Sequence, residues 1–167
     1  MKALALLVLF TAPALASDNS AAERNAVVLS PAQTKFILRC GGCHGTLGAS
    51  PPLSVPQLRG LAGWFLCTPD AREYVVRLPN VSRAQLSDAD LAQVMNFVTF
   101  DLGGASTPPA TVRFTAAEVA AIRTRPLNVL PLNAYRRQIV TGLIRRCGAP
   151  ASLRDYGKAN AVTIAAR

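Results

Sequence analysis

The sequence is poor in the residue types that build many metal and acid–base sites. Its 167 residues include one histidine, four cysteines and two methionines. A structural zinc centre takes about four nitrogen or sulfur ligands, which this chain barely supplies. Acidic residues are also scarce, with 9 against 18 lysines and arginines, so the formal net charge is +9. Any site chemistry must therefore depend on a few positions.

Long apolar runs are nearly absent as well. Met1 and Lys2 precede an apolar run from Ala3 to Phe10, and the small-residue sequence Ala14-Leu15-Ala16 follows. This pattern is typical of a secretory signal peptide over residues 1–16, with cleavage after Ala16. An uncleaved N-terminal anchor is the alternative. No later run approaches the roughly 20 residues that a spanning helix needs, so no integral membrane span is expected after cleavage.

The stretch with the most specific chemical signature is Cys40-Gly41-Gly42-Cys43-His44. Two cysteines separated by two residues and followed directly by histidine form the attachment sequence for c-type haem. Residues three apart share one face of a helix, so both thiols can reach one haem edge while the histidine turns to the iron. A Cys-x-x-Cys redox centre and a zinc site are weaker alternatives, since the first does not require the histidine.

These residues predict one covalently attached haem c. Cys40 and Cys43 are expected to hold it, and His44 is expected to be the proximal iron ligand. Haem is attached to exported chains in the bacterial periplasm, so the signal peptide and the motif together favour that compartment, where disulfides persist. The two remaining cysteines, Cys67 and Cys147, are a candidate disulfide in such a compartment, and two free thiols are the alternative.

A second motif follows the first. Pro56-Gln57-Leu58-Arg59-Gly60-Leu61 resembles the Pro-x-Leu-x-Gly segment of class I cytochromes c, and its proline lies twelve residues after His44. The resemblance implies that the Pro56 carbonyl accepts a hydrogen bond from Nδ1 of His44, which would fix the tautomer and make the ring a better iron donor. A plain proline-rich loop is the alternative, because two further prolines lie close by.

The resemblance covers roughly residues 30–102 and implies an all-α fold, the class I cytochrome c fold around one covalently bound haem. Ser30-Pro31 predicts the start of a first helix, and residues 70–77 look helical. Ser87 and Asp90 approximate a capping box that starts a closing helix. In that helix Asn96-Phe97 lie where the family often has an aromatic residue against the first helix. Candidate contacts to a haem propionate are Trp64, Tyr74 and Arg77, with core packing or solvation as the alternatives.

The chain departs from the family at the sixth iron ligand. Where the family has a methionine before a proline, this chain has Leu78 before Pro79, and leucine cannot coordinate iron. Met95 in the closing helix is the candidate sixth ligand, with Cys67 and Asn80 as other donors and an open position as the alternative. Methionine ligation suits outer-sphere electron transfer, whereas an open position admits small molecules.

The C-terminal part has a different composition. We expect a flexible arm over residues 17–29, a Gly/Pro/Thr-rich linker over 103–114, and a basic helical extension and tail over 115–167. One helix starts at a capping box of Thr115 and Glu118. A second runs from about 134 to 146 with its arginines outward, and a loosely packed tail begins at Ala149. The extension is expected to lie against the haem domain as a short helical appendage without a core of its own. The arginines expected on the outside of the second helix are Arg136, Arg137, Arg145 and Arg146.

Positive charge is concentrated in this extension. Residues 17–101 contain seven basic and seven acidic residues, whereas ten basic and two acidic residues follow from Leu102 onward. Such a charged segment favours docking to a periplasmic redox partner with an acidic surface, and membrane headgroups are another acidic surface. No nucleic acid partner is expected after export.

Together these observations favour a periplasmic monohaem c-type cytochrome that transfers single electrons between redox proteins and is not an enzyme. One alternative is a haem enzyme or gas-binding sensor with an open sixth iron position, although no distal histidine is present to act as a general base. A further alternative is a cytochrome subunit of a larger dehydrogenase.

Overall fold

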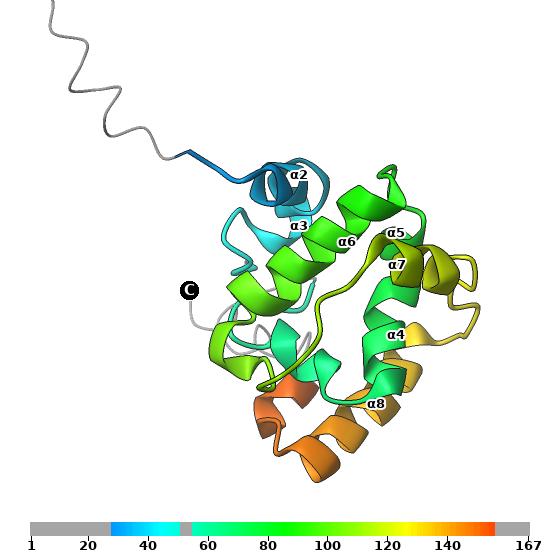
Figure 1. Cartoon of the computed structure of the whole chain (residues 1–167). Helices are drawn as coiled ribbons and strands as arrows, with labels where there is room; N and C mark the ends of the chain where they lie inside the picture. Colours follow the sequence, from blue (N-terminus) through cyan, green and yellow to red (C-terminus); the bar gives the residue numbers. More distant parts are fainter. Residues whose placement is uncertain (1–27, 51–54, 156–167) are drawn as a thin grey trace, which may run out of the picture.

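The computed structural model of the protein describes residues 28–50 and 55–155. The predicted signal peptide, residues 17–27 of the predicted arm and the end of the predicted tail from residue 156 lie outside this part. The described residues form helices and connecting segments, with no strand among them (Figure 1). This confirms the all-α prediction for the described part of the chain.

The helices are short, and several follow one another almost directly. The α-helices are α2 (Pro31–Arg39), α3 (Gly41–His44), α4 (Pro69–Arg77), α5 (Pro79–Ser82), α6 (Asp88–Asn96), α7 (Ala116–Arg123) and α8 (Leu132–Cys147). Between and after them lie the 3-10 helices η1 (Ala62–Leu66), η3 (Gly104–Ser106) and η4 (Ala151–Asp155), and the π-helix η2 (Phe97–Leu102), which continues α6.

Local sequence explains where four of these helices begin. A serine or threonine hydroxyl accepts a hydrogen bond from the backbone N–H three residues further on, which satisfies one of the donors left open at a helix start. The residues that do so are Ser30, Thr68, Ser87 and Thr115. Proline follows directly at the first position of α2 and α4, where its missing N–H costs nothing.

The first helix packs across the closing helix. Phe36 of α2 is fully buried, and its ring centroid lies 5.4 Å from that of Phe97 at the junction of α6 and η2. Lys35 of α2 pairs with Asp90 at the start of α6, with 2.5 Å between Nζ and Oδ1. The aromatic contact expected between Phe97 and the first helix is therefore present.

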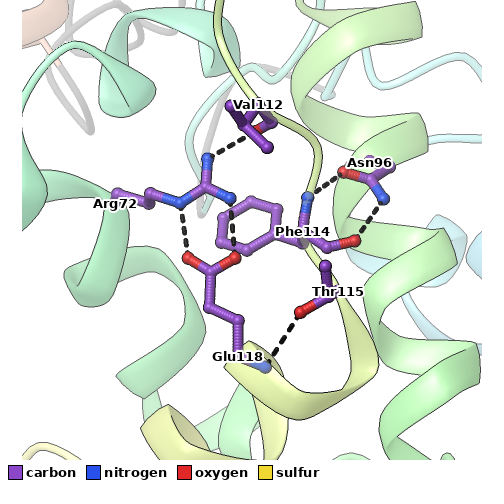
Figure 2. Close-up of polar contacts among 6 residues, drawn as sticks. All are labelled: Arg72, Asn96, Val112, Phe114, Thr115 and Glu118. Atoms are coloured by element: carbon purple, nitrogen blue, oxygen red, sulfur yellow. Dashed lines mark hydrogen bonds and ion pairs between the residues drawn. The ribbon is translucent and has the colours of Figure 1, made fainter.

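The segment predicted as a linker is anchored at Ser106 and Phe114, which are buried. Phe114 is 4% exposed, and its backbone N–H and carbonyl are both hydrogen-bonded by the amide of Asn96, at 2.8 and 3.0 Å (Figure 2). Composition predicts a linker over 103–114, and the amide side chain of Asn96 in α6 satisfies the backbone of Phe114 and fixes the end of this segment.

The helical extension packs against the preceding helices and shares their buried core. α7 packs against α4, α5 and α6, and it buries Val119 and Ile122 with residues of α4 and α6 (Figure 1). The start of the predicted tail is also ordered, since Ala149 and Leu153 are 5% and 3% exposed and η4 packs on α8. The prediction of a loosely packed tail from Ala149 is therefore wrong for residues 149–155, because apolar side chains anchor them.

A bidentate ion pair connects α4 to α7. Arg72 donates from Nε to Oε1 of Glu118 at 2.6 Å and from Nη2 to Oε2 at 2.8 Å (Figure 2). Its Nη1 donates to the Val112 carbonyl, and the guanidinium lies 3.8 Å from the centroid of the Phe114 ring. The hydrogen bonds from Arg72 hold the pKa of Glu118 below its usual value, against the opposing effect of burial.

Other basic residues of the extension pair with acidic residues of the preceding helices. Arg123 of α7 contacts Asp88 at 2.9 Å and donates to three carbonyls around the α5–α6 turn, those of Ser82, Ala84 and Leu86. Arg125 lies 3.5 Å from Glu73, and Arg146 lies 3.4 Å from Asp70. Part of the positive charge of the extension is thus matched inside the molecule.

We expect Glu118→Gln to lower the free energy of unfolding by about 1 to 3 kcal/mol at pH 7, because it removes a partly buried, charge-assisted hydrogen-bonded pair. The lowered pKa means that this contribution is complete above the usual pKa of a glutamate and is lost as pH falls through the folded-state value. Urea unfolding of both proteins across acidic and neutral pH should therefore show a difference that shrinks at low pH.

Glu73→Gln is the matched control, since Glu73 pairs with an arginine of the extension but at 3.5 Å and with 40% of its side chain exposed. This change should cost less than about 1 kcal/mol at any pH. Equal effects of the two substitutions, or a pH-independent effect of Glu118→Gln, would contradict the role given to the Arg72–Glu118 pair.

Candidate haem site

A cavity of about 960 Å³ lies among the helices. This volume is near the upper end of the roughly 300–1,000 Å³ found for ligand pockets, so the cavity suits a large flat cofactor. Most of its lining is apolar, and it comes from residues 55–61 and 78–86 as well as from η1, α4, α6, η2 and α8. The apolar lining includes Phe65, Val75, Leu91, Val94 and Val98.

The predicted attachment residues lie at this cavity. α2 ends at Cys40, whose N–H donates to the Phe36 carbonyl, and His44 closes the short turn of α3 by donating its N–H to the Cys40 carbonyl at 2.9 Å. Cys40 is half-buried and lines the cavity, while Cys43 is exposed, and both are free thiols. Burial raises the pKa of the Cys40 thiol, and the neighbouring Cys43 adds to this.

A hydrogen bond to Pro56 orients the ring of His44, as the resemblance to class I cytochromes c implies. Nδ1 of His44 lies 3.0 Å from the Pro56 carbonyl oxygen, which also accepts a hydrogen bond from the Ser50 hydroxyl at 3.1 Å. A carbonyl only accepts, so Nδ1 carries the proton and Nε2 keeps its lone pair. Burial lowers the pKa of His44, although the Pro56 hydrogen bond opposes this, and the neutral ring is the form that binds a metal.

Met95 and Asn80, two candidates for the sixth iron ligand, line the cavity. Leu78, which stands where class I cytochromes c have a methionine, lines it as well. Met95 of α6 is 5% exposed, Leu78 lies between α4 and α5, and Asn80 is in α5. Cys67 is not available as a donor, because it forms a disulfide with Cys147. The structure thus removes the thiolate alternative and brings a thioether and an amide to the same cavity.

The three candidates for a propionate contact have different surroundings. Tyr74 lines the cavity, and its ring centroid lies 5.9 Å from those of both Phe65 and Tyr135. Trp64 packs beside the cluster that contains Phe65 and is not in the cavity lining. Arg77 donates to the Arg125 carbonyl at 2.6 Å and is likewise outside the lining.

Arg136 is a site residue that the sequence pattern misplaces. The pattern predicts it on the outer face of the second helix of the extension, but it is 7% exposed and lines the cavity. Its spacing from Val140 and Leu143, which are both fully buried, places all three on one face of α8. That spacing is visible in the sequence, but the charge of an arginine favours solvent, and only the position of η4 over α8 shows why it is buried.

The disulfide fastens α8 to the rest of the cavity wall. Cys67 directly follows η1 and Cys147 ends α8, and 80 residues separate them in the chain. Both half-cystines pack beside the same buried cluster, which includes Phe65, Ala71 and Tyr74. The cross-link therefore holds the C-terminal helix next to two elements that line the cavity.

The described residues also lack two other features. No helix within 28–50 and 55–155 is long and apolar enough to cross a membrane. The same residues contain no cluster of three or more His, Cys, Asp or Glu side chains that would hold a metal ion.

Known proteins provide an independent comparison. The chain is 27% identical over 123 residues to cytochrome c-552 of Thermus thermophilus, across 63% of this chain and 94% of the relative. A second cytochrome c-552, from a particular strain of the same species, matches at the same identity, and the match covers 83% of that protein. This similarity supports a c-type cytochrome. No protein-family model and no solved structure matches the chain.

We expect the Cys67–Cys147 disulfide to stabilise the protein by about 2 to 4 kcal/mol, because it closes a long loop in the unfolded chain. Urea unfolding with and without dithiothreitol measures this effect in the wild type. The double variant Cys67→Ser/Cys147→Ser should match the reduced wild type and should not respond to the reductant. A wild-type midpoint that the reductant leaves unchanged, together with two free thiols by mass analysis, would contradict the expectation.

Proposed function

We propose that this protein is a periplasmic monohaem c-type cytochrome that transfers single electrons between redox proteins. The observation that carries the proposal is the position of Cys40 and His44 on one large, mostly apolar cavity, with His44 hydrogen-bonded to Pro56. A cavity of this volume beside a Cys-x-x-Cys-His turn fits haem, and the distant similarity to cytochrome c-552 agrees with that cofactor.

Each residue of the motif has a separate role in the proposal. Cys40 and Cys43 form thioether bonds to the haem, and His44 binds its iron through Nε2. The Pro56 carbonyl keeps the proton on Nδ1, and the added electron density strengthens His44 as a ligand. When bound, haem supplies an iron centre that changes reversibly by one electron.

Met95 is the proposed sixth ligand. Its side chain is buried, lines the cavity and belongs to α6, which is held against α2 and α7. A thioether in this position raises the reduction potential and leaves small molecules no place to bind, which suits outer-sphere electron transfer. The apolar lining keeps water away from the site and thereby limits reorganisation on electron transfer.

One observation favours a second candidate function. Leu78 lines the cavity at the position where the resembling family has its methionine, and it provides no donor atom. If Met95 does not bind iron, the sixth position is open and the protein binds a small molecule such as carbon monoxide or nitric oxide. The protein would then be a gas-binding sensor or haem enzyme rather than an electron carrier.

The proposed partner is a periplasmic redox protein with an acidic surface. Arg137 and Arg145 are exposed on α8, where they border a shallow depression. Arg123 and Arg125 form ion pairs within the molecule, so they are not counted in the proposed docking surface. Cationic side chains left on one helix face would steer an acidic partner and raise its association rate.

The attachment residues make the first functional prediction. Wild-type protein matured in the periplasm should carry one haem that stays with the chain under denaturing electrophoresis. Cys40→Ala/Cys43→Ala should abolish this covalent haem, whereas Cys67→Ser/Cys147→Ser should retain it. The pyridine haemochrome spectrum and the mass of the intact protein measure the outcome. A wild-type chain without haem, or haem retained without the two attachment thiols, would overturn the proposed function.

The sixth position makes the second functional prediction. Reduced wild-type protein should not respond to carbon monoxide, and Met95→Leu, which nearly conserves side-chain volume, should bind it. Val94→Ala is the control, because it enlarges the same cavity from the same helix and leaves the thioether in place. Visible spectra of oxidised and reduced protein, with the gas added to the reduced sample, report each result.

Carbon monoxide binding by the wild type would instead favour the open-site candidate. In that case Leu78→Met, which places a thioether before Pro79, should suppress binding of the gas. If carbon monoxide binds neither the wild type nor Met95→Leu, Met95 is not the sixth iron ligand.

A further inference from the structure

The C-terminal extension forms one wall of the proposed cofactor cavity. Leu132, Asn133 and Arg136 of α8 line the same cavity as Cys40 and His44, and so do Ser152 and Leu153 of η4. The disulfide to Cys67 holds the end of α8 in place. Residues of the C-terminal extension therefore line the same cavity as the attachment motif.

The charged groups of this cavity are all of one sign. Among the described residues of the lining, the charged side chains are Arg39, Arg59 and Arg136, and none is an aspartate or glutamate. Arg39 and Arg59 are exposed, whereas Arg136 is 7% exposed. The other titratable groups of this lining are Cys40, His44 and Tyr74. The cavity thus favours an anionic ligand, and its buried positive charge comes from the extension.

Contacts with two elements orient Arg136. Its Nη1 donates to the Leu153 carbonyl of η4 at 3.0 Å, and its guanidinium lies 5.8 Å from the centroid of the Phe65 ring of η1. A guanidinium presents five N–H donors in a planar fork that matches a carboxylate.

We propose that Arg136 binds a carboxylate of the haem, so that the C-terminal extension is part of the cofactor site. Haem carries two propionate carboxylates, and a haem attached at Cys40 and Cys43 would occupy the cavity that Cys40, His44 and Arg136 line. This inference rests on the proposed function, because it needs haem in the cavity. A small diffusible anion would use the same chemistry, but a cavity of about 960 Å³ fits a propionate-bearing macrocycle.

The pairing has a consequence that a purely structural role would not have. A positive charge beside the propionate offsets a negative charge near the iron and favours the reduced state. It also keeps the carboxylate ionised, so that reduction takes up no proton. Loss of the charge should lower the reduction potential and raise the pKa of the carboxylate into the range where the potential depends on pH.

The test compares Arg136→Gln with Arg137→Gln in the full-length haem protein. Arg137 is the next residue of α8, carries the same charge and is exposed, so it controls for charge and helix position. Haem content by pyridine haemochrome comes first, and a chain without haem would refute the proposed function rather than this inference. Redox titrations from pH 5 to 8 then give the reduction potential of each protein.

We expect Arg136→Gln to lower the potential and to add a pH dependence that wild type and Arg137→Gln lack. Equal potentials and equal pH profiles of the two variants would overturn the proposal. A wild-type potential that shifts saturably with added acetate, together with loss of this shift in Arg136→Gln, would assign Arg136 to a diffusible anion and also overturn it.

If Arg136→Gln does not fold, Arg136→Lys and its control Arg137→Lys replace the pair. Lysine keeps the charge but loses the planar fork. We expect Arg136→Lys to lower the potential slightly and to add a weak pH dependence, and Arg137→Lys to behave as wild type. Identical redox profiles of these two variants would overturn the proposal.

Discussion

The helices of this protein surround a cavity of about 960 Å³, and this limits how they can pack against each other. Buried side chains form three clusters instead of one continuous core. One joins η1 and α4 to α8, a second joins α4 and α6 to α7, and a third joins α2 to α6 and η2. Each cluster holds helices together at a different part of the cavity wall, so the extension is needed for two of the three.

Charge is distributed to support the same arrangement. The sequence has a nearly neutral first part and a strongly basic last part, which by itself suggests a cationic docking surface. In the structure Arg123 and Arg125 pair with Asp88 and Glu73, and Arg72 of the first part pairs with Glu118 of the last. Some of the positive charge in the last part of the chain therefore forms ion pairs with the first part. The exposed arginines of α8 are left to contact a partner.

The proposed iron ligands differ in how they reach the cavity. His44 is placed by a turn at the end of α2 and by one hydrogen bond to Pro56, so short stretches of chain determine its orientation. Met95 reaches the cavity because of the way α6 is packed between α2 and α7, and Arg136 because of the way η4 lies over α8. The same cavity thus combines one locally determined ligand with residues that long-range packing brings to it.

The sequence by itself determined the helix starts at Ser30, Ser87 and Thr115, because each depends on groups three residues apart. The pairing of His44 with Pro56 followed from the resemblance to class I cytochromes c. Only the tertiary structure decided that Phe114 is buried at the end of the segment 103–114, that Ala149 and Leu153 are buried, and that Arg136 is buried. Those outcomes depend on partners far away in the chain, such as Asn96 for Phe114, and neither composition nor helical periodicity contains that information.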